Sequence, residues 1–151
     1  ASFILIGDTP NKKYFEECRD YVKRSGLQKR VKFYGKIEQN KIANFMNESK
    51  VLVMASSYEG LPRVLIEAGL CSLPSIAPNI DGVSSPFGEK GGTAIYELNN
   101  HNEFLKNLNN FYKDSNHYSD LSKKAYEISN ELSGKNTFAK NWSNLIEEVT
   151  K

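Results

Sequence analysis

Cysteine, histidine and long hydrophobic runs are scarce in this sequence, and each scarcity excludes a class of protein. The 151 residues include two cysteines, Cys18 and Cys71, with no CxxC motif and no histidine beside either. This pattern argues against a zinc site and against a disulfide framework, so we expect reduced thiols and a cytoplasmic protein. No apolar stretch approaches the roughly 18 residues of a membrane-spanning helix, so we expect no membrane span.

A strong excess of one charge is also missing. Twenty basic and 18 acidic residues are interspersed, and the net charge is +2. This balance provides no electrostatic footprint for nucleic acid, which we therefore do not expect as a partner. The first third of the chain is locally basic, at Lys12, Lys13, Lys23, Arg24, Lys29, Arg30 and Lys32. We interpret these residues as a solvated helix face and the loop after it, with a docking surface for an anionic partner as the alternative.

The composition is that of an ordinary globular domain, with 39% hydrophobic and 25% charged residues. A chain of this length buries a sizeable core, so we expect one domain over residues 1–151. The sequence opens at Ala1 directly into "SFILIG", which we predict to be a buried strand. Because domains rarely begin at a central strand, we expect this domain to be a fragment of a longer protein.

Strands and helices are predicted to alternate along the chain. Short apolar runs predict strands at residues 2–6, 31–35, 50–56, 73–79 and 91–97. Apolar residues at helical spacing predict helices at residues 12–25, 36–49, 62–71, 100–113, 118–132 and 137–149. The run at 50–56 is continuous, as in strands buried on both faces. We therefore predict an α/β fold, a Rossmann-like parallel sheet of about five to six strands with helices on both faces.

In such sheets, ligands bind at the carboxyl ends of the strands. One of these ends carries the stretch "SSYEGLPRVLIEAGL", in which Pro62 suits the first position of a helix. Gly60 and Leu61 then offer amide groups to a phosphate at the positive helix end. Glu67 follows about 7–8 Å along the axis, a distance that matches the step from diphosphate to ribose in one nucleotide. A carboxylate accepts from both ribose hydroxyls, and Glu59 would lie beyond the phosphate, near the group that the phosphate carries.

The two carboxylates also have simpler explanations. Arg63 precedes Glu67 by four residues, so the two could form a surface ion pair worth a few tenths of a kcal/mol. Glu59 could be a helix-entry charge that the helix dipole favours. Spacing alone leaves both explanations open.

The order of the motifs resembles the carboxyl-terminal, donor-binding domain of the group 1 glycosyltransferases, a retaining family with the GT-B architecture. Their E-x7-E motif corresponds to "EGLPRVLIE", from Glu59 to Glu67. "FILIGD" resembles the family's first strand and glycine loop, and "LQKRVKFYGKI" its second strand. "LPSIAPNIDGV" resembles the strand and glycine turn that follow the motif. The likeness covers roughly residues 2–113.

The resemblance implies a role for each matching residue. Glu67 would bind the ribose hydroxyls, and Glu59 would act as the catalytic contact, at the donor sugar and the charge that develops around it. The other implied donor-binding residues are Gly60, Leu61 and Pro62 at sugar and phosphate, Gly35, Lys36 and Ile37 along the base, Gly7 at the phosphates, and Asp81, Gly82 and Val83 across the cleft. The Arg and Lys that hold the diphosphate in the family lie in the segment before this domain.

The implied activity is transfer of a sugar, with retention, from a nucleotide-diphosphate sugar to an acceptor in polysaccharide or glycoconjugate synthesis. The nucleotide-sugar is a substrate, and neither a cofactor nor an essential metal is expected. The implied partners are the donor, an acceptor glycan or lipid, and the protein's own N-terminal domain, which would supply the acceptor site. That domain would also bring the protein to the inner membrane face. We expect the isolated domain to bind nucleotide weakly and to transfer no sugar.

The sequence departs from the family pattern at a few positions. Ser72 stands where the family usually has glycine, and Ser84 and Ser85 stand where an acid often follows the glycine turn. His101 lies in the predicted helix at 100–113 and His117 directly before the one at 118–132, and both are interpreted as solvent-facing. Two alternatives stay open: a non-catalytic nucleotide-sugar binding module, and a GT-B epimerase acting on nucleotide-sugars.

Overall fold

The computed structural model describes residues 1–88 and 90–134, and the predicted helix at 137–149 lies outside these residues. All strand pairs in it are parallel, and helices connect the strands, so the predicted α/β class is confirmed. The five strands of the described residues lie in two sheets. The chain forms two compact units, which divide between Ile42 and Ala43. Helix α2, Gln39–Glu48, contains this boundary.

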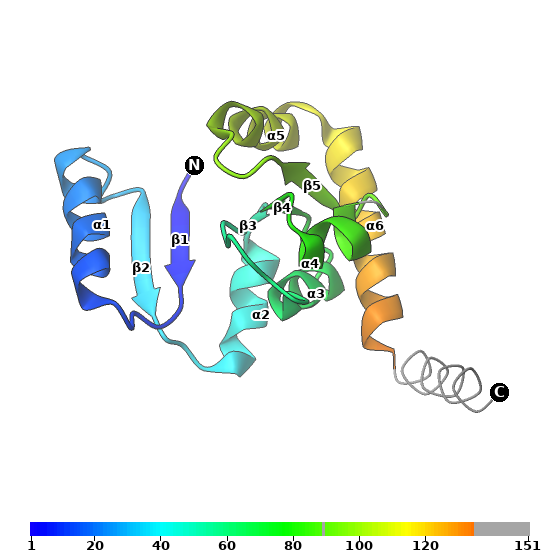
Figure 1. Ribbon diagram of the computed structural model, residues 1–151, viewed down its shortest axis with the longest axis horizontal. Helices are drawn as coiled ribbons and strands as arrows, with labels where there is room; N and C mark the ends of the chain where they lie inside the picture. Colours follow the sequence, from blue (N-terminus) through cyan, green and yellow to red (C-terminus); the bar gives the residue numbers. More distant parts are fainter. Residues whose placement is uncertain (89, 135–151) are drawn as a thin grey trace. The chain divides into compact units, whose positions relative to one another are not determined.

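The first unit contains two parallel strands and the helix that joins them. Strands β1, Phe3–Ile6, and β2, Val31–Gly35, are hydrogen-bonded neighbours, and helix α1, Lys12–Arg24, lies against them (Figure 1). The ring of Phe15 packs edge-on against the ring of Phe33, with 5.4 Å between their centroids. This contact holds the first turn of α1 against the sheet.

The prediction that residues 2–6 form a buried strand is right about the strand and wrong about its burial. All four residues of β1 are exposed, from 46% for Phe3 to 37% for Ile6. Within the described residues, β1 has β2 as its hydrogen-bonded neighbour and no second strand beside it. An apolar run predicts a strand from its residue types, whereas burial depends on what covers the strand.

The second unit contains a three-stranded parallel sheet in the order β3-β4-β5. Strand β4, Ser75–Pro78, lies between β3, Leu52–Val53, and β5, Thr93–Tyr96. Every residue of β4 is buried, as expected for a central strand. The predicted strand at 50–56 is confirmed in type, but its ladder has two residues and both are partly exposed. The expectation of burial on both faces is wrong because β3 is an edge strand of this sheet.

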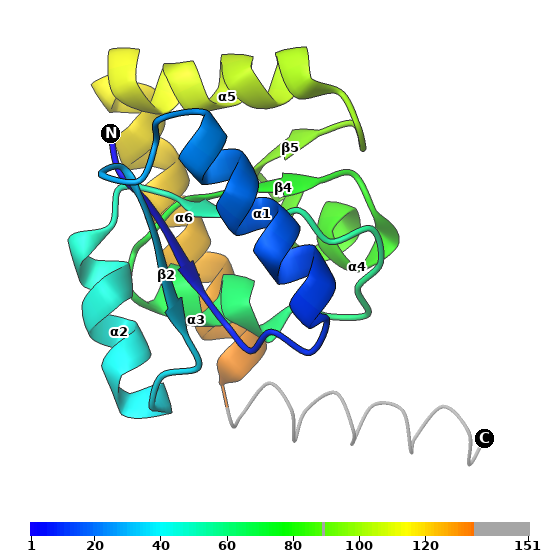
Figure 2. The same cartoon turned by 90° about the vertical axis from the view of Figure 1, so that its left-hand side faces the viewer.

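Three longer helices pack on this sheet: α3, Arg63–Leu70, α5, His101–Lys113, and α6, Ser115–Ser133. Helices α3 and α6 lie side by side, and α5 lies beside β5 (Figure 2). The α3–α6 contact is close enough that a Cβ atom on Gly69 would lie 2.0 Å from the Ser129 hydroxyl oxygen. The main hydrophobic cluster of this unit consists of Met54, Leu65, Ala77, Val83, Phe87 and Ile128.

A short helical segment follows β4, where the sequence predicted only a loop. Helix α4, Asp81–Val83, continues into a π-helical turn, Ser84–Gly88. Both are too short for a periodic apolar pattern, which explains why the sequence did not reveal them. The part of the chain that the structure describes has no helix with both the length and the apolarity to cross a bilayer.

Candidate functional site

The loop between β3 and α3 carries the first acid of the motif and rests directly on α4. A Cβ atom built on Gly82 would lie 2.2 Å from the carbonyl oxygen of Glu59 and 2.4 Å from that of Gly60. The backbone of α4 therefore touches the backbone of this loop, and glycine is what allows the approach. The structure thus brings together Glu59, Gly60 and Gly82, which were predicted as site residues from two separate stretches.

Helix α3 begins one residue later than predicted, because Pro62 precedes the helix instead of being its first residue. Pro62 is the N-cap residue, with φ −72° and ψ 100°, and the first helical residue is Arg63. The Pro62 carbonyl accepts a hydrogen bond from the Leu65 amide at 3.0 Å. Gly60 and Leu61, which precede the cap, are both exposed, and the side chain of Leu61 is half exposed. The start of α3 is therefore open to a ligand at these two residues.

Glu67 is partly buried in the middle of α3, between the partly buried Ile66 and the buried Ala68. Among the residues that the structure describes, its carboxylate has no ion pair and no hydrogen bond. Arg63, one turn earlier, is exposed and does not pair with it. The surface ion pair proposed as the simpler explanation is therefore not formed. The ribose contact stays a prediction.

Glu59 is also partly buried, and its carboxylate likewise has no ion pair and no hydrogen bond among the residues that the structure describes. It lies three residues before the N-cap of α3. The geometry is compatible both with a helix-entry charge and with a ligand contact.

The three predicted residues of α4 differ in what they expose. Asp81 is exposed, whereas Gly82 is buried against the Glu59–Gly60 loop. Val83 is fully buried in the core with Leu65 and Met54. Any contact that Val83 makes with a ligand would therefore come from its backbone.

The remaining predicted site residues lie in the first unit. The amide of Gly7 donates to the carbonyl of Gly35 at 3.0 Å, which joins the carboxyl ends of β1 and β2. Gly35 has φ +66°, a left-handed conformation that favours glycine. Lys36 is exposed and Ile37 is partly buried.

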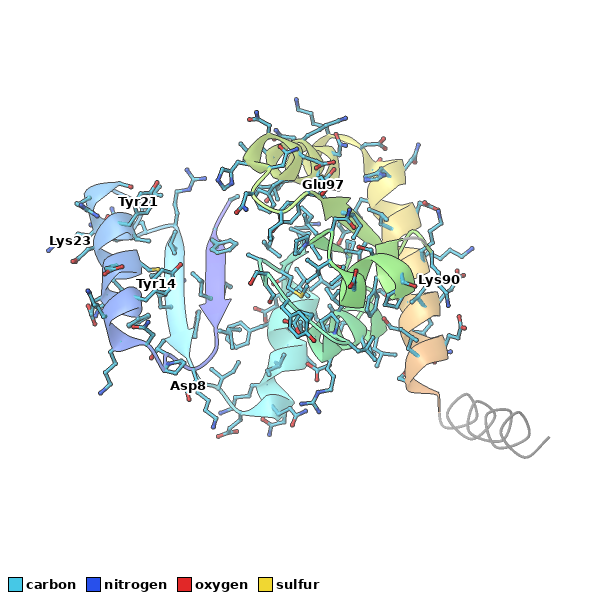
Figure 3. All side chains as sticks on the ribbon, viewed as in Figure 1. Asp8, Tyr14, Tyr21, Lys23, Lys90 and Glu97 are labelled. Carbon is cyan, nitrogen blue, oxygen red and sulfur yellow. The ribbon has the colours of Figure 1, made fainter. Side chains whose placement is uncertain are left out.

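A cavity of about 310 Å³ in the first unit was not predicted from the sequence. It lies beside Gly7 and Gly35, and Asp8 and Tyr14, which Figure 3 labels, line it together with Cys18. A hydrogen bond with the Cys18 thiol raises the pKa of the Tyr14 phenol above its usual value. The residues that form the cavity are spread over β1, β2, α1 and the intervening loop, so no local motif announces it.

Asn79 and Glu97 are two further residues that sequence reasoning missed. The Asn79 side-chain amide donates to a Glu97 carboxylate oxygen at 2.7 Å, and the Ser84 hydroxyl donates to the Asn79 side-chain oxygen. Asn79 follows β4 and Glu97 follows β5, whose last residues, Pro78 and Tyr96, are register partners. The register of adjacent parallel strands would have brought the two together, but no single-sequence pattern gives that register.

The carboxyl end of β3 is tied to the same region by Tyr96. Its hydroxyl donates to the carbonyl of Met54 at 3.2 Å in the interior, and burial raises the pKa of Tyr96 above its usual value. Within residues 1–88 and 90–134, no group of three or more His, Cys, Asp or Glu side chains is arranged to hold a metal ion.

Comparison with protein-family models gives a match to the family described as glycosyl transferases group 1 over residues 1–128. The UDP-Gal:alpha-D-GlcNAc-diphosphoundecaprenol alpha-1,3-galactosyltransferase of Escherichia coli is 30% identical over 109 residues, which cover 70% of this chain and 26% of that enzyme. The N-acetyl-alpha-D-glucosaminyl L-malate synthase of Bacillus anthracis is 31% identical over 83 residues, which cover 55% of this chain and 20% of that enzyme. The chain thus spans about a quarter or less of the length of these relatives.

Solved structures share the fold over nearly the whole chain. HepE of Anabaena in complex with UDP matches with a TM-score of 0.82 at 22% identity, over 95% of this chain and 41% of that chain. The C-terminal domain of LpcC, a group 1 family protein of Francisella tularensis, matches with a TM-score of 0.74 at 22% identity, over 84% of this chain and 67% of that one. The family match over residues 1–128 shows that the chain belongs to the group 1 glycosyl transferases, and its fold is that of their carboxyl-terminal domain.

Proposed function

We propose that this chain is the donor-binding half of a retaining glycosyltransferase, which transfers a sugar from a nucleotide-diphosphate sugar to an acceptor in polysaccharide or glycoconjugate synthesis. Membership of the group 1 family supports the class of reaction. The name of the E. coli relative gives UDP-galactose as its donor, and the structure of HepE was solved in complex with UDP-glucose. UDP-sugars are therefore the first donors to test.

The observation that carries the proposal is the unpaired carboxylate of Glu67. A partly buried carboxylate without a counter-charge loses part of its hydration and gains no compensating interaction within the described residues. Two vicinal ribose hydroxyls would supply that interaction, because each can donate to one carboxylate oxygen. The exposed Gly60 and Leu61 at the start of the same helix then offer the position for the diphosphate.

In this arrangement, Glu59 contacts the donor sugar at the reacting end. Its carboxylate stabilises the positive charge that develops on the sugar as the bond to the diphosphate breaks. Gly60, Leu61 and Pro62 shape the pocket around sugar and phosphate, and Asp81, Gly82 and Val83 border its other side. The roles implied for Gly7 at the phosphates and for Gly35, Lys36 and Ile37 at the base concern the first unit, and they stay predictions. The reaction as proposed requires no metal.

Titration calorimetry of the chain with UDP, GDP, ADP and dTDP tests the donor site. We expect one of the four to bind, and Glu67→Gln to weaken it. A charge-assisted hydrogen bond contributes about 1.5–3 kcal/mol, so the affinity is expected to fall roughly 10- to 100-fold. Glu67→Gln keeps the shape of the side chain, removes its charge and replaces one acceptor oxygen by an NH2 donor.

The matched control is Glu127→Gln on α6. Glu127 is an exposed helix residue in a surface pair with Lys123 at 3.9 Å, and we expect its substitution to leave nucleotide affinity unchanged. If no nucleoside diphosphate binds at millimolar concentration, or if Glu67→Gln and Glu127→Gln behave alike, the ribose role is wrong.

Product analysis on the longer protein separates the transferase from the two alternatives. Transfer to an acceptor supports the transferase, whereas a changed nucleotide-sugar without transfer would indicate an epimerase. Binding without turnover would indicate a non-catalytic module.

A further inference from the structure

Asn79 lies at a junction of three segments in the second unit. Its backbone amide donates to the carbonyl of Tyr96 at 2.7 Å, where β5 ends. Its side-chain amide donates to Glu97 at 2.7 Å, and its side-chain oxygen accepts from the hydroxyl of Ser84, the first residue of the π-helical turn. Figure 3 labels Glu97, beside the turn that leads from β5 to α5. One side chain thus links the ends of β4 and β5 to the segment that begins with α4.

Helix α4 needs such support because it is very short. A three-residue helix has hardly any internal hydrogen bonding, so its position is set by contacts outside it. Val83 anchors its buried side. The backbone amides of Val83 and Ser84 both donate to the carbonyl of Ile80, at 2.9 and 2.8 Å. The Ser84 hydroxyl, which also lies 3.0 Å from that carbonyl oxygen, adds the bond to the Asn79 side chain.

The position of α4 is transmitted directly to the donor loop. The backbone of Gly82 is in contact with the carbonyl oxygens of Glu59 and Gly60, without room for even one extra carbon atom. A displacement of α4 by a few tenths of an ångström therefore displaces this loop. The bonds of Asn79 consequently bear on Glu59, although none of them is to Glu59 itself.

We propose that Asn79 is a positioning residue for the donor site, which holds α4, and through Gly82 the Glu59–Gly60 backbone, by its bonds to Ser84 and Glu97. The proposal rests on the proposed function for its link to nucleotide binding. Ser84 stands near the position at which the family often has an acid. A serine hydroxyl can donate to Asn79 here, whereas a carboxylate could only accept.

The direction of each hydrogen bond makes the proposal specific. The Asn79 side chain accepts from Ser84 through its oxygen and donates to Glu97 through its nitrogen. Asn79→Asp therefore keeps the bond from Ser84 and turns the bond to Glu97 into a contact between two carboxylates. Adding Glu97→Gln restores the hydrogen bond in the opposite direction, because the side-chain amide introduced at position 97 can donate to the carboxylate introduced at position 79. The double variant also has the same net charge as the native pair. The backbone of Glu97 stays fixed, because its amide donates to Glu103 at 2.7 Å independently of the Glu97 side chain.

The first test is an amide NMR spectrum of the chain without ligand. We expect Asn79→Asp to shift the resonances of Gly60 and Gly82, and Asn79→Asp with Glu97→Gln to return them toward their native positions. Asn109→Asp on α5 is the matched control, because it makes the same chemical change at an exposed residue. It should leave the Gly60 resonance in place.

The second test is the affinity for the nucleoside diphosphate that the native chain binds best. One hydrogen bond of this kind shifts an equilibrium by roughly two- to tenfold, which is the loss expected for Asn79→Asp. We expect the double variant to recover native affinity within about a factor of two. If Asn79→Asp merely destabilised the fold, the melting temperature would fall, and the double variant would not restore the affinity and the Gly60 resonance.

Two results would overturn the positioning role. One is an unchanged Gly60 resonance and unchanged affinity in Asn79→Asp. The other is a double variant as impaired as the single one, because reciprocal rescue is what the geometry requires. If the Gly60 resonance responds and recovers as expected while the native chain binds no nucleoside diphosphate, the positioning role is supported and the proposed function fails.

Discussion

Gly82→Ala provides a quantitative test of the contact between α4 and the donor loop. The added Cβ atom would lie 2.2 Å from the Glu59 carbonyl oxygen, whereas ordinary contacts begin at 3.4 Å. The two backbones must therefore separate by about 1 Å, and neither obstacle is a flexible side chain. Overpacking of this kind costs about 1–3 kcal/mol. At about 2–4 °C per kcal/mol for a chain of this size, the melting temperature should fall by about 2–12 °C.

Gly60→Ala is the matched control in the same contact. A Cβ atom on Gly60 would meet nothing within 4 Å, and its backbone is not left-handed. We expect Gly60→Ala to melt within about 1 °C of the native chain, since exposed substitutions of this kind have small effects. Because Gly60 faces the proposed ligand, the same variant is expected to bind nucleoside diphosphate more weakly. Thermal melts followed by circular dichroism, combined with calorimetric titration, separate the two effects. A native melting temperature for Gly82→Ala would refute the close approach.

Two further predictions concern backbone conformation and helix packing in the second unit. Ser72 has φ +54°, a strained conformation for serine, so Ser72→Gly should raise the melting temperature by about 2–4 °C. Asn99→Gly, at φ +69°, should change the melting temperature less, because asparagine tolerates this region. Equal shifts of the two variants in calorimetric melts would contradict this account. Gly69→Ala should lower the free energy of unfolding by about 1–3 kcal/mol, because its Cβ would lie 2.0 Å from the Ser129 hydroxyl oxygen and 2.5 Å from the Ala125 carbonyl oxygen. Ser129→Ala should not destabilise the protein, because this buried hydroxyl has no hydrogen-bond partner among the described residues. Gly69→Ala combined with Ser129→Ala should recover only part of the unfolding free energy that Gly69→Ala loses. Full recovery in urea titrations would show that the Ala125 contact has no effect.

The elements that the sequence predicted well are those with several turns or several strand residues. The apolar stripes of α1, α5 and α6 placed these helices correctly, and the short apolar runs identified all five described strands. Burial was harder to predict. The residues of β1 and β3 have the composition of interior strands, but β3 is an edge strand and β1 has one neighbouring strand among the described residues, so their side chains are partly exposed.

At the candidate site, the sequence identified residues that share a motif and missed those joined by strand register. Glu59, Gly60 and Glu67 lie within nine positions of one another, so their spacing on a loop and helix could be predicted. The contact of Gly82 with Glu59 depends on how β3 and β4 are aligned, and the bridge from Asn79 to Glu97 depends on how β4 and β5 are aligned. Ser72 shows the same limit, because its departure from glycine was visible in the sequence whereas the left-handed backbone that makes it matter was not.

The two carboxylates of the motif are supported in different ways, which has a consequence for donor choice. Glu67 is part of α3, whose buried Leu65, Ala68 and Gly69 pack in the core and against α6, so its position is fixed by a long, rigid contact. Glu59 lies in a loop whose backbone contacts that of Gly82 in a three-residue helix. Under the proposed function, changes in α4 and the π-helical turn would move the sugar end of the site and leave the ribose end in place. Substitutions at Asn79 or Ser84 should therefore alter discrimination between donor sugars that share one nucleotide by more than the roughly two- to tenfold loss expected for the nucleoside diphosphate itself.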